Sequence, residues 1–213
     1  MDVNDSIIRS LSAPRHRFAG HERFFDAAAI GVESTEAKDS ATSDGGVSSW
    51  EAAVKQVKVE FALLLGCAES EIAVFYNTTA AAQRILLCLK RALGPYRGTL
   101  MLTDAEYPGI VAAAHEYWDG GIAMARISRL LWRGKTAEAE DVLKRTYVAC
   151  RPCVLYVSHV TRAVGYTIQL STLQFMKSVL PRLVIVVDGA QAVGNVAVTR
   201  DFLSVADFYI TSS

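Results

Sequence analysis

The sequence has little of what marks a secreted, membrane-spanning or nucleic-acid-binding protein. Its 213 residues include four cysteines, which in a chain of this length do not indicate a disulfide framework. The formal net charge is +0, so no excess of basic residues favours nucleic acid or a membrane surface as a partner. The longest apolar runs, at 61–68 and 183–187, are too short to cross a bilayer. Neither nucleic acid nor a membrane is an expected partner.

Three further signals are missing. Residues 1–18 carry acidic residues and no apolar stretch of the kind found in signal peptides, so a cytoplasmic protein is expected. No internal repeat is present. Neither a Gly-rich P-loop nor a G-x-G-x-x-G motif occurs, which disfavours an unrelated α/β nucleotide or phosphate binder.

What is present is a chain able to form one large domain. Apolar residues make up 51% of it, enough for a sizeable core. One stretch, ESTEAKDSATSDGGVSS at 33–49, is poor in core-forming residues and predicts an exposed, flexible loop. We therefore divide the chain into an N-terminal segment and loop, 1–49, and a main domain, 50–213.

Helix and strand patterns alternate through the main domain. Apolar spacing predicts helices at 50–64, 79–93, 109–118, 136–149 and 171–180, and short apolar runs predict strands at 71–76, 98–103, 122–127, 153–158, 183–188 and 207–211. This alternation predicts an α/β fold, with a mostly parallel sheet covered by helices on both faces. Ligands of such sheets bind at the carboxyl ends of the strands.

Polar residues follow the strand predicted at 71–76. Asn77, Thr78 and Thr79 open the next helix, and hydroxyl and N–H groups at a helix N-terminus suit a phosphate. The other reading is an ordinary helix cap, and taken alone it is the more common one.

Two further strand ends carry candidate groups. Tyr107 follows the strand at 98–103 and either stacks on a planar ligand or is a surface aromatic beside a turn. Asp188 ends the apolar run VIVV and either caps a turn or holds a protonated ring nitrogen. A phosphate seat, a stacking ring and an acid for a ring nitrogen are together what pyridoxal 5′-phosphate requires of a protein.

At this point the sequence resembles the class-V family of pyridoxal-phosphate enzymes, which includes cysteine desulfurases, aminotransferases and isopenicillin-N-epimerase-like proteins. The segments that carry the resemblance are VDGAQAVGNVAV with ADFYITSS, NTTAAAQRILL, DAEYPG and SHVTRAVGYTIQL. It covers most of 50–213. It implies the large domain of the fold-type-I pyridoxal-phosphate transferases, incomplete at its C-terminus and without the family's small C-terminal domain.

The resemblance also implies roles for cofactor-binding residues. Asp188 pairs with the pyridine nitrogen, and Gln191 hydrogen-bonds the phenolic oxygen of the ring. Thr78 and Thr79 bind the phosphate, and Ser212 adds a hydroxyl. No metal is expected, because the C-x-x-C at Cys150 and Cys153 has no second pair of ligands.

The resemblance places three further residues at or beside the cofactor ring and the substrate. Tyr107 stands where the family often has His. A tyrosine at this position keeps the stacking ring but loses a candidate acid/base group. Arg162 stands where the family often has Asn; it either grips a substrate carboxylate or points to solvent. His159 matches a family His and is either a cofactor neighbour or a hydrogen-bonded wall residue.

The resemblance implies no catalytic residue within this chain. In the family, the stretch matching Ser212 and Ser213 is followed by His and then by the Lys that forms the Schiff base. Every lysine here precedes Asp188: Lys38, Lys55, Lys58, Lys90, Lys135, Lys144 and Lys177. The expectation is that the sequence is a fragment, a natural truncation or half of a split enzyme.

The function expected of the complete protein is pyridoxal-phosphate chemistry on an amino acid or amine. Aminotransfer, C–S cleavage and epimerisation all remain open. The alternative is a non-catalytic scaffold of the same fold, or one half of a split enzyme. Family members are usually homodimers, so the complete form is expected to be one.

Overall fold

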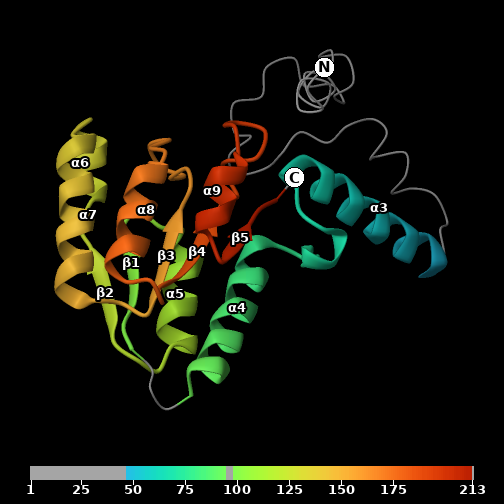
Figure 1. Ribbon diagram of the computed structural model, residues 1–213, viewed down its shortest axis with the longest axis horizontal. Coiled ribbons are helices and arrows are strands. Elements are labelled where there is room, and N and C mark those ends of the chain that lie inside the picture. The colour runs from blue at the N-terminus through green and yellow to red at the C-terminus, as the bar shows by residue number, and fades with distance from the viewer. Residues whose placement is uncertain (1–46, 95–97, 213) are drawn as a thin grey trace. The chain divides into compact units, whose positions relative to one another are not determined.

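The structure is a computed structural model that describes residues 47–94 and 98–212 (Figure 1). These residues form two compact units, one up to Val74 and one from Phe75 onward. The first contains helix α3 (Val47–Leu65) and the 3₁₀ turn η2 (Glu69–Glu71). Residues 1–46 of the N-terminal segment predicted at 1–49 lie outside the described residues. The last three residues of that segment belong to α3.

The second unit is built on a five-stranded sheet in the order β2-β1-β3-β4-β5. All of the pairings are parallel, as the sequence predicts. The strands are β1 (Leu100–Thr103), β2 (Ile122–Ala125), β3 (Val154–Ser158), β4 (Val184–Asp188) and β5 (Phe208–Ile210). The order reverses between β1 and β3, which makes this the topological switch point of the sheet.

Helices cover both faces of the sheet (Figure 1). Residues of β3 alternate between two cores: Val154 and Tyr156 face one, Leu155 and Val157 the other. The first core also contains α4 and α5, and the second contains α6 to α9. The helices are α4 (Thr78–Leu93), α5 (Pro108–Tyr117), α6 (Ser128–Trp132), α7 (Thr136–Cys150), α8 (Leu170–Val179) and α9 (Arg200–Val205).

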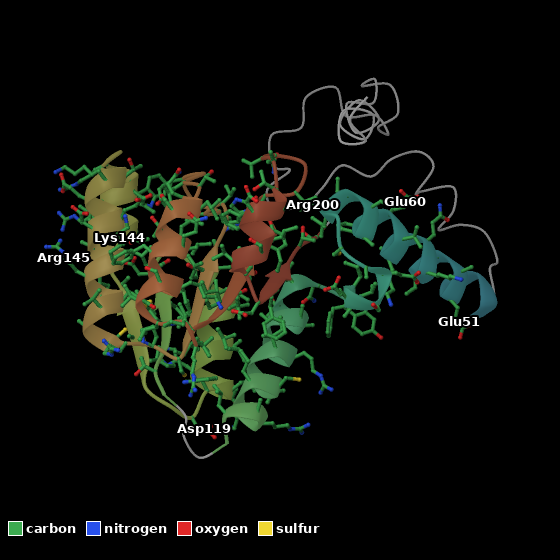
Figure 2. All side chains as sticks on the ribbon, viewed as in Figure 1. Glu51, Glu60, Asp119, Lys144, Arg145 and Arg200 are labelled. Atoms are coloured by element: carbon green, nitrogen blue, oxygen red, sulfur yellow. The ribbon has the colours of Figure 1, made fainter. Side chains whose placement is uncertain are left out.

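Helix α7 shows why the sequence pattern identified these helices. Ala139, Leu143 and Tyr147 recur every four residues and are buried against the sheet. Lys144 and Arg145 lie on its outer side (Figure 2). Burying a side chain as large as Leu143 contributes roughly 1.5–3 kcal/mol, so this apolar face stabilises the packing of the helix on the sheet.

The strand predicted at 71–76 is wrong. Its first residue ends η2, and the following residues form neither helix nor strand. A β-strand needs a neighbour for its backbone N–H and C=O groups, and no described strand pairs with this segment. Its apolar side chains are correspondingly exposed, including Phe75 at 41% and Tyr76 at 97%.

Two short helices, α6 and α9, have no counterpart in the sequence prediction. Each has six residues or fewer, too short for an apolar period to register. In the described part of the chain, no helix has both the length and the apolar character needed to cross a membrane.

Candidate functional site

The candidate site lies at the carboxyl edge of the sheet in the second unit. Strand β1 pairs with β2 along four residues but with β3 only at Leu100↔Val154 and Met101↔Leu155. The ends of β1 and β3 therefore diverge toward Thr103 and Ser158. Such a divergence at the switch point is where open α/β sheets bind ligands.

Helix α4 begins at Thr78, with Asn77 as its N-cap. The Asn77 side chain accepts a 2.8 Å hydrogen bond from the N–H of Ala80, and its carbonyl accepts from the N–H of Ala81. The N–H groups of Thr78 and Thr79 belong to the first turn, where no acceptor within the helix is available. The cap and the open N–H groups coexist, so the two sequence readings of this segment do not compete.

Asp188 ends β4 and is 7% exposed. Its Oδ2 accepts a 2.8 Å hydrogen bond from the phenol of Tyr156, and its Oδ1 accepts one of 3.0 Å from the N–H of Ala190. In the described part of the chain, no Lys, Arg or His side chain forms an ion pair with it. A carboxylate has about four lone-pair positions, so Asp188 retains acceptor capacity for a cationic N–H group.

Gly189 follows Asp188 and is packed against Tyr209 of β5. A Cβ at this position would overlap the Tyr209 ring, so only glycine fits. The Gly189 N–H donates a 2.6 Å bond to the carbonyl of Ile210. Strands β4 and β5 are thus held together at the residue that follows Asp188.

His159 lies on the other face of the sheet from the Asp188 side chain. It comes one residue after Ser158, so alternation along the strand sends its ring toward α9, where it stacks on Phe202 at 3.9 Å. Its Nδ1 lies 2.9 Å from the hydroxyl of Tyr209. Burial lowers the pKa of His159 to about 4, so the ring is neutral at pH 7. It meets Asp188 through its backbone N–H, which donates to the Asp188 carbonyl at 2.8 Å.

The exposed side chains of Tyr107 and Arg162 lie close together. Tyr107 is the N-cap residue of α5 and is 47% exposed. The Arg162 guanidinium carbon lies 6.0 Å from the centroid of the Tyr107 ring, a cation–π distance. A Cβ at Gly109 would lie 2.8 Å from Tyr107 Cε1 and 3.6 Å from Thr79 Oγ1, so Tyr107 and Thr79 flank the same small residue.

Gln191 and Ser212 complete the residues predicted for the site. Gln191 is half-buried three residues after Asp188, and its carbonyl accepts a 3.1 Å bond from Asn195 Nδ2. Ser212 is exposed, two residues after the end of β5, and its carbonyl accepts from Thr211 Oγ1 at 3.3 Å. Both lie on segments that leave the carboxyl edge of the sheet.

Sequence reasoning missed Glu106, a second buried acid at this edge. It lies in the turn after β1 and is 7% exposed. Its Oε1 accepts a 2.6 Å bond from the Thr103 hydroxyl, and its Oε2 accepts one of 2.5 Å from the Ser158 hydroxyl. The pKa of Glu106 is raised to about 7, mainly by burial and to a smaller extent by the charge of Asp188, while the hydrogen bonds from the two hydroxyls lower it.

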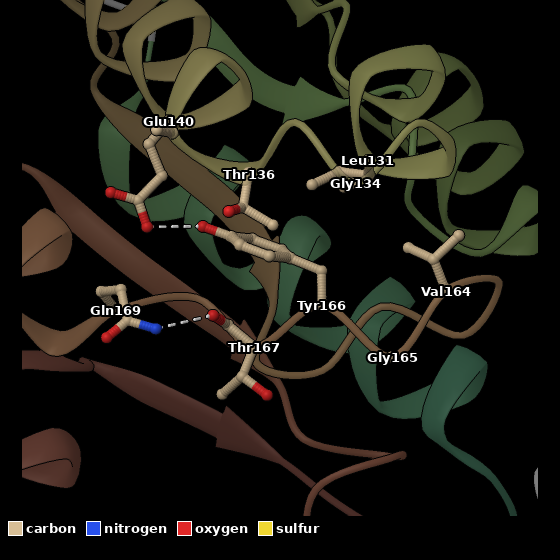
Figure 3. A pocket seen from close by; sticks show the side chains of 10 residues that line it. Leu131, Gly134, Thr136, Glu140, Val164, Gly165, Tyr166, Thr167 and Gln169 are labelled. Carbon is tan, nitrogen blue, oxygen red and sulfur yellow. Dashed lines mark hydrogen bonds between the residues drawn. The ribbon is translucent and has the colours of Figure 1, made fainter.

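A cavity of about 630 Å³ lies elsewhere, between α6, the start of α7 and the loop at 164–169 (Figure 3). None of the residues predicted for the site lines it. Its polar wall is occupied internally, since Glu140 accepts a 2.7 Å bond from Tyr166 (Figure 3) and another from Thr172. We assign it no ligand.

The four cysteines are all free. Cys150 Sγ lies 3.8 Å from Met101 Sδ, and Cys153 Sγ lies 3.5 Å from the Thr99 carbonyl. Burial raises the pKa of both thiols, which makes them less reactive. Among the described residues, no group of three or more His, Cys, Asp or Glu side chains could hold a metal ion.

Comparison with known proteins identifies the family. The family profile for class-V aminotransferases matches residues 33–213. The chain belongs to the class-V aminotransferase family. Enzymes of this family depend on pyridoxal phosphate. A search of curated protein sequences gave no match to the chain.

Solved structures agree on the fold. A NifS-like protein matches with a TM-score of 0.62 at 16% identity, covering 80% of this chain and 46% of that one. A structure of SspA in complex with cysteine matches with a TM-score of 0.59 at 16% identity, covering 80% and 48%. The apo cysteine desulfurase of Thermococcus onnurineus NA1 matches with a TM-score of 0.57 at 19% identity, covering 80% and 41%.

These matches establish the α/β fold of the large domain of fold-type-I pyridoxal-phosphate enzymes. This chain spans less than half the length of each of the three matched protein chains.

Proposed function

We propose that this chain forms part of a pyridoxal 5′-phosphate-dependent enzyme that acts on an amino acid or amine. The observation that carries the proposal is one arrangement at the carboxyl edge of the sheet. A buried carboxylate without an ion-pair partner among the described residues, Asp188, shares this edge with the aromatic ring of Tyr107 and the open N-terminus of α4.

The phosphate would be held at the start of α4. The N–H groups of Thr78 and Thr79 are donors without a helical acceptor, and the partial positive charge of the helix N-terminus favours an anion. The hydroxyls of both residues and of Ser212 add further donors. This donor set fits a phosphate dianion.

The ring would be held between Asp188 and Tyr107. Asp188 would keep a proton on the pyridine nitrogen, since Tyr156 and Ala190 leave part of its acceptor capacity free. Gln191 would donate to the phenolic oxygen of the ring. Tyr107 would cover one face of the ring, and Gly109 provides the room for it.

Arg162 is the candidate for binding the substrate. Its guanidinium is exposed and stays close to Tyr107 at the mouth of the site. A guanidinium binds a carboxylate through two parallel hydrogen bonds, so an amino acid is the substrate class it favours. His159 is neutral and packed on Phe202, so its role is to support the end of β3.

Bound pyridoxal phosphate supplies an electron sink that stabilises negative charge developing on a substrate carbon. The residues of this chain would bind the cofactor, exclude water from its ring and hold the proton on its nitrogen. Whether aminotransfer, C–S cleavage or epimerisation follows depends on parts of the family fold beyond the described residues. A homodimer and a cytoplasmic location remain predictions of the sequence.

The proposal is tested by equilibrium dialysis of the purified chain against pyridoxal phosphate. Asp188→Asn removes the charge from the ring-nitrogen partner and is expected to weaken binding roughly tenfold or more, the effect of losing one charge-assisted hydrogen bond. Thr79→Val is expected to weaken binding of both pyridoxal phosphate and inorganic phosphate.

The matched control is Asp141→Asn, an exposed Asp to Asn change on α7. It is expected to leave binding unchanged. The proposed site is wrong if the chain binds no pyridoxal phosphate. It is also wrong if Asp188→Asn, like the control Asp141→Asn, binds pyridoxal phosphate as well as the wild type does.

A further inference from the structure

Glu106 connects the two strands that diverge at the switch point. Its carboxyl accepts from Thr103, the last residue of β1, and from Ser158, the last residue of β3. The two strands pair through their backbones only at their first residues. The Glu106 side chain is therefore the link between the ends of β1 and β3 at the point where their backbones have separated.

The surroundings of Glu106 make its charge state matter. The titratable groups that face it are Asp188 at the end of β4 and Tyr156 of β3. Both are acids, so neither neutralises a charge on Glu106. The pKa of Glu106 is raised to about 7 by burial first of all, so its carboxyl gains and loses a proton near neutral pH.

Tyr107 follows Glu106 directly in the sequence but differs from it in exposure. Glu106 is buried and Tyr107 is half-exposed beside Gly109 and Arg162. A shift of the Glu106 side chain moves the backbone that the two residues share. The shared backbone is the route by which the Glu106 side chain would act on the Tyr107 ring.

We propose that Glu106 is a positioning residue of the candidate site: its carboxyl ties the end of β1 to the end of β3 and sets the Tyr107 ring, and the negative charge that it gains beside Asp188 on losing a proton changes that tie. Its bearing on cofactor binding rests on the proposed function above. The link from Glu106 to Tyr107 does not.

The first test follows the Tyr107 ring by ¹H–¹³C NMR of the whole chain carrying ring-labelled tyrosine, with Tyr107→Phe assigning its signal. The wild-type signal is expected to move with a midpoint near the pKa of Glu106, about 7. In Glu106→Gln, which keeps a neutral donor and acceptor, the signal should stay at its low-pH position. Glu116→Gln, an exposed change on α5, should titrate as the wild type does.

A second variant keeps the test decisive if Glu106→Gln does not fold. Ser158→Ala removes a hydrogen bond that lowers the pKa of Glu106. The midpoint of the Tyr107 signal should therefore move to higher pH. A Tyr107 signal that does not change between about pH 5.5 and 8.5, or that titrates alike in wild type, Ser158→Ala and Glu106→Gln, overturns the proposal.

The second test compares pyridoxal-phosphate affinity in Glu106→Gln and wild type at about pH 6 and pH 8. At each pH, the ratio of the variant's affinity to the wild type's affinity cancels the titration of the ligand itself. This ratio should favour Glu106→Gln by about tenfold more at the higher pH, which is the size of the effect of one added like charge at short range. A pH-independent ratio, with binding intact, overturns the link to the site. If neither protein binds the ligand while the NMR titration holds, the proposed function fails and the Glu106–Tyr107 link stands.

Discussion

The phenol of Tyr156 on β3 donates a 2.8 Å hydrogen bond to Oδ2 of Asp188, which ends the neighbouring strand β4. Both groups are buried. Desolvation, and then the charge of Asp188, raise the pKa of Tyr156 well above its ordinary value, so the phenol remains a donor. A carboxylate that has lost its water is thus held by a fixed protein dipole at the centre of the candidate site.

Tyr156→Phe is the first prediction. It removes this donor and leaves Asp188 with one hydrogen bond fewer, which should lower the free energy of unfolding by about 1–2 kcal/mol. Urea unfolding at pH 7 measures it. Tyr76→Phe, in a side chain that is 97% exposed, should change the free energy of unfolding by much less. Equal effects of the two changes would contradict the role given to Tyr156.

The second prediction concerns pH and Glu106. Its pKa is raised from 4.5 to about 7 in the folded chain, so between these values the folded state binds more protons than the unfolded state. Stability contributed by the neutral acid is therefore present at low pH and is lost as the pH rises through about 7, by up to about 3 kcal/mol.

Glu106→Gln cannot lose a proton and should lack this decline. Urea unfolding at about pH 5 and pH 8 measures the difference between variant and wild type, which should turn in favour of the variant at the higher pH. A difference that is the same at both pH values would show that Glu106 is already ionised in the folded chain.

Gly189→Ala is the third prediction. The new Cβ would overlap the ring of Tyr209, and the contact lies between two strands that cannot separate without breaking the Gly189–Ile210 hydrogen bond. A loss of stability of about 3 kcal/mol or more is expected.

A double-mutant cycle separates this overlap from other causes. In a Tyr209→Leu background the same Gly189→Ala change should cost much less. If it costs as much as in the wild type, Tyr209 is not the reason for the glycine.

Gly109→Ala is the fourth prediction and separates stability from binding. Alanine is the better helix former, so the free energy of unfolding should stay equal or rise by up to about 1 kcal/mol. Its Cβ, 2.8 Å from Tyr107 Cε1, displaces the ring and should weaken pyridoxal-phosphate binding several-fold. Tyr107→Phe keeps the ring and should bind like the wild type. Unchanged binding in Gly109→Ala would remove Tyr107 from the site.

The sequence alone predicted the parallel sheet with helices on both faces, because short continuous apolar runs and helical apolar spacing report burial directly. It failed at 71–76, where an apolar run has no described strand to pair with. Apolar character predicts burial, but a strand also needs a partner, and pairing is a property of the whole fold.

At the site, the sequence identified side chains at strand ends but not which face they take. Counting alternate residues from Tyr156 would have separated Ser158 from His159, whose ring lies against Phe202. The sequence did not predict the burial of Glu106, since an acid in a turn is usually exposed. In the structure it is buried where the ends of β1 and β3 diverge, and it accepts hydrogen bonds from both.

The most direct test of the central claim is the ¹⁵N chemical shift of [¹⁵N]pyridoxal phosphate bound to the chain. If Asp188 holds the ring nitrogen, the bound signal should lie at the position of a protonated pyridine in the wild type and in Asp141→Asn, and at that of a neutral pyridine in Asp188→Asn. A neutral ring nitrogen in the wild type, or no bound signal at all, would contradict the account.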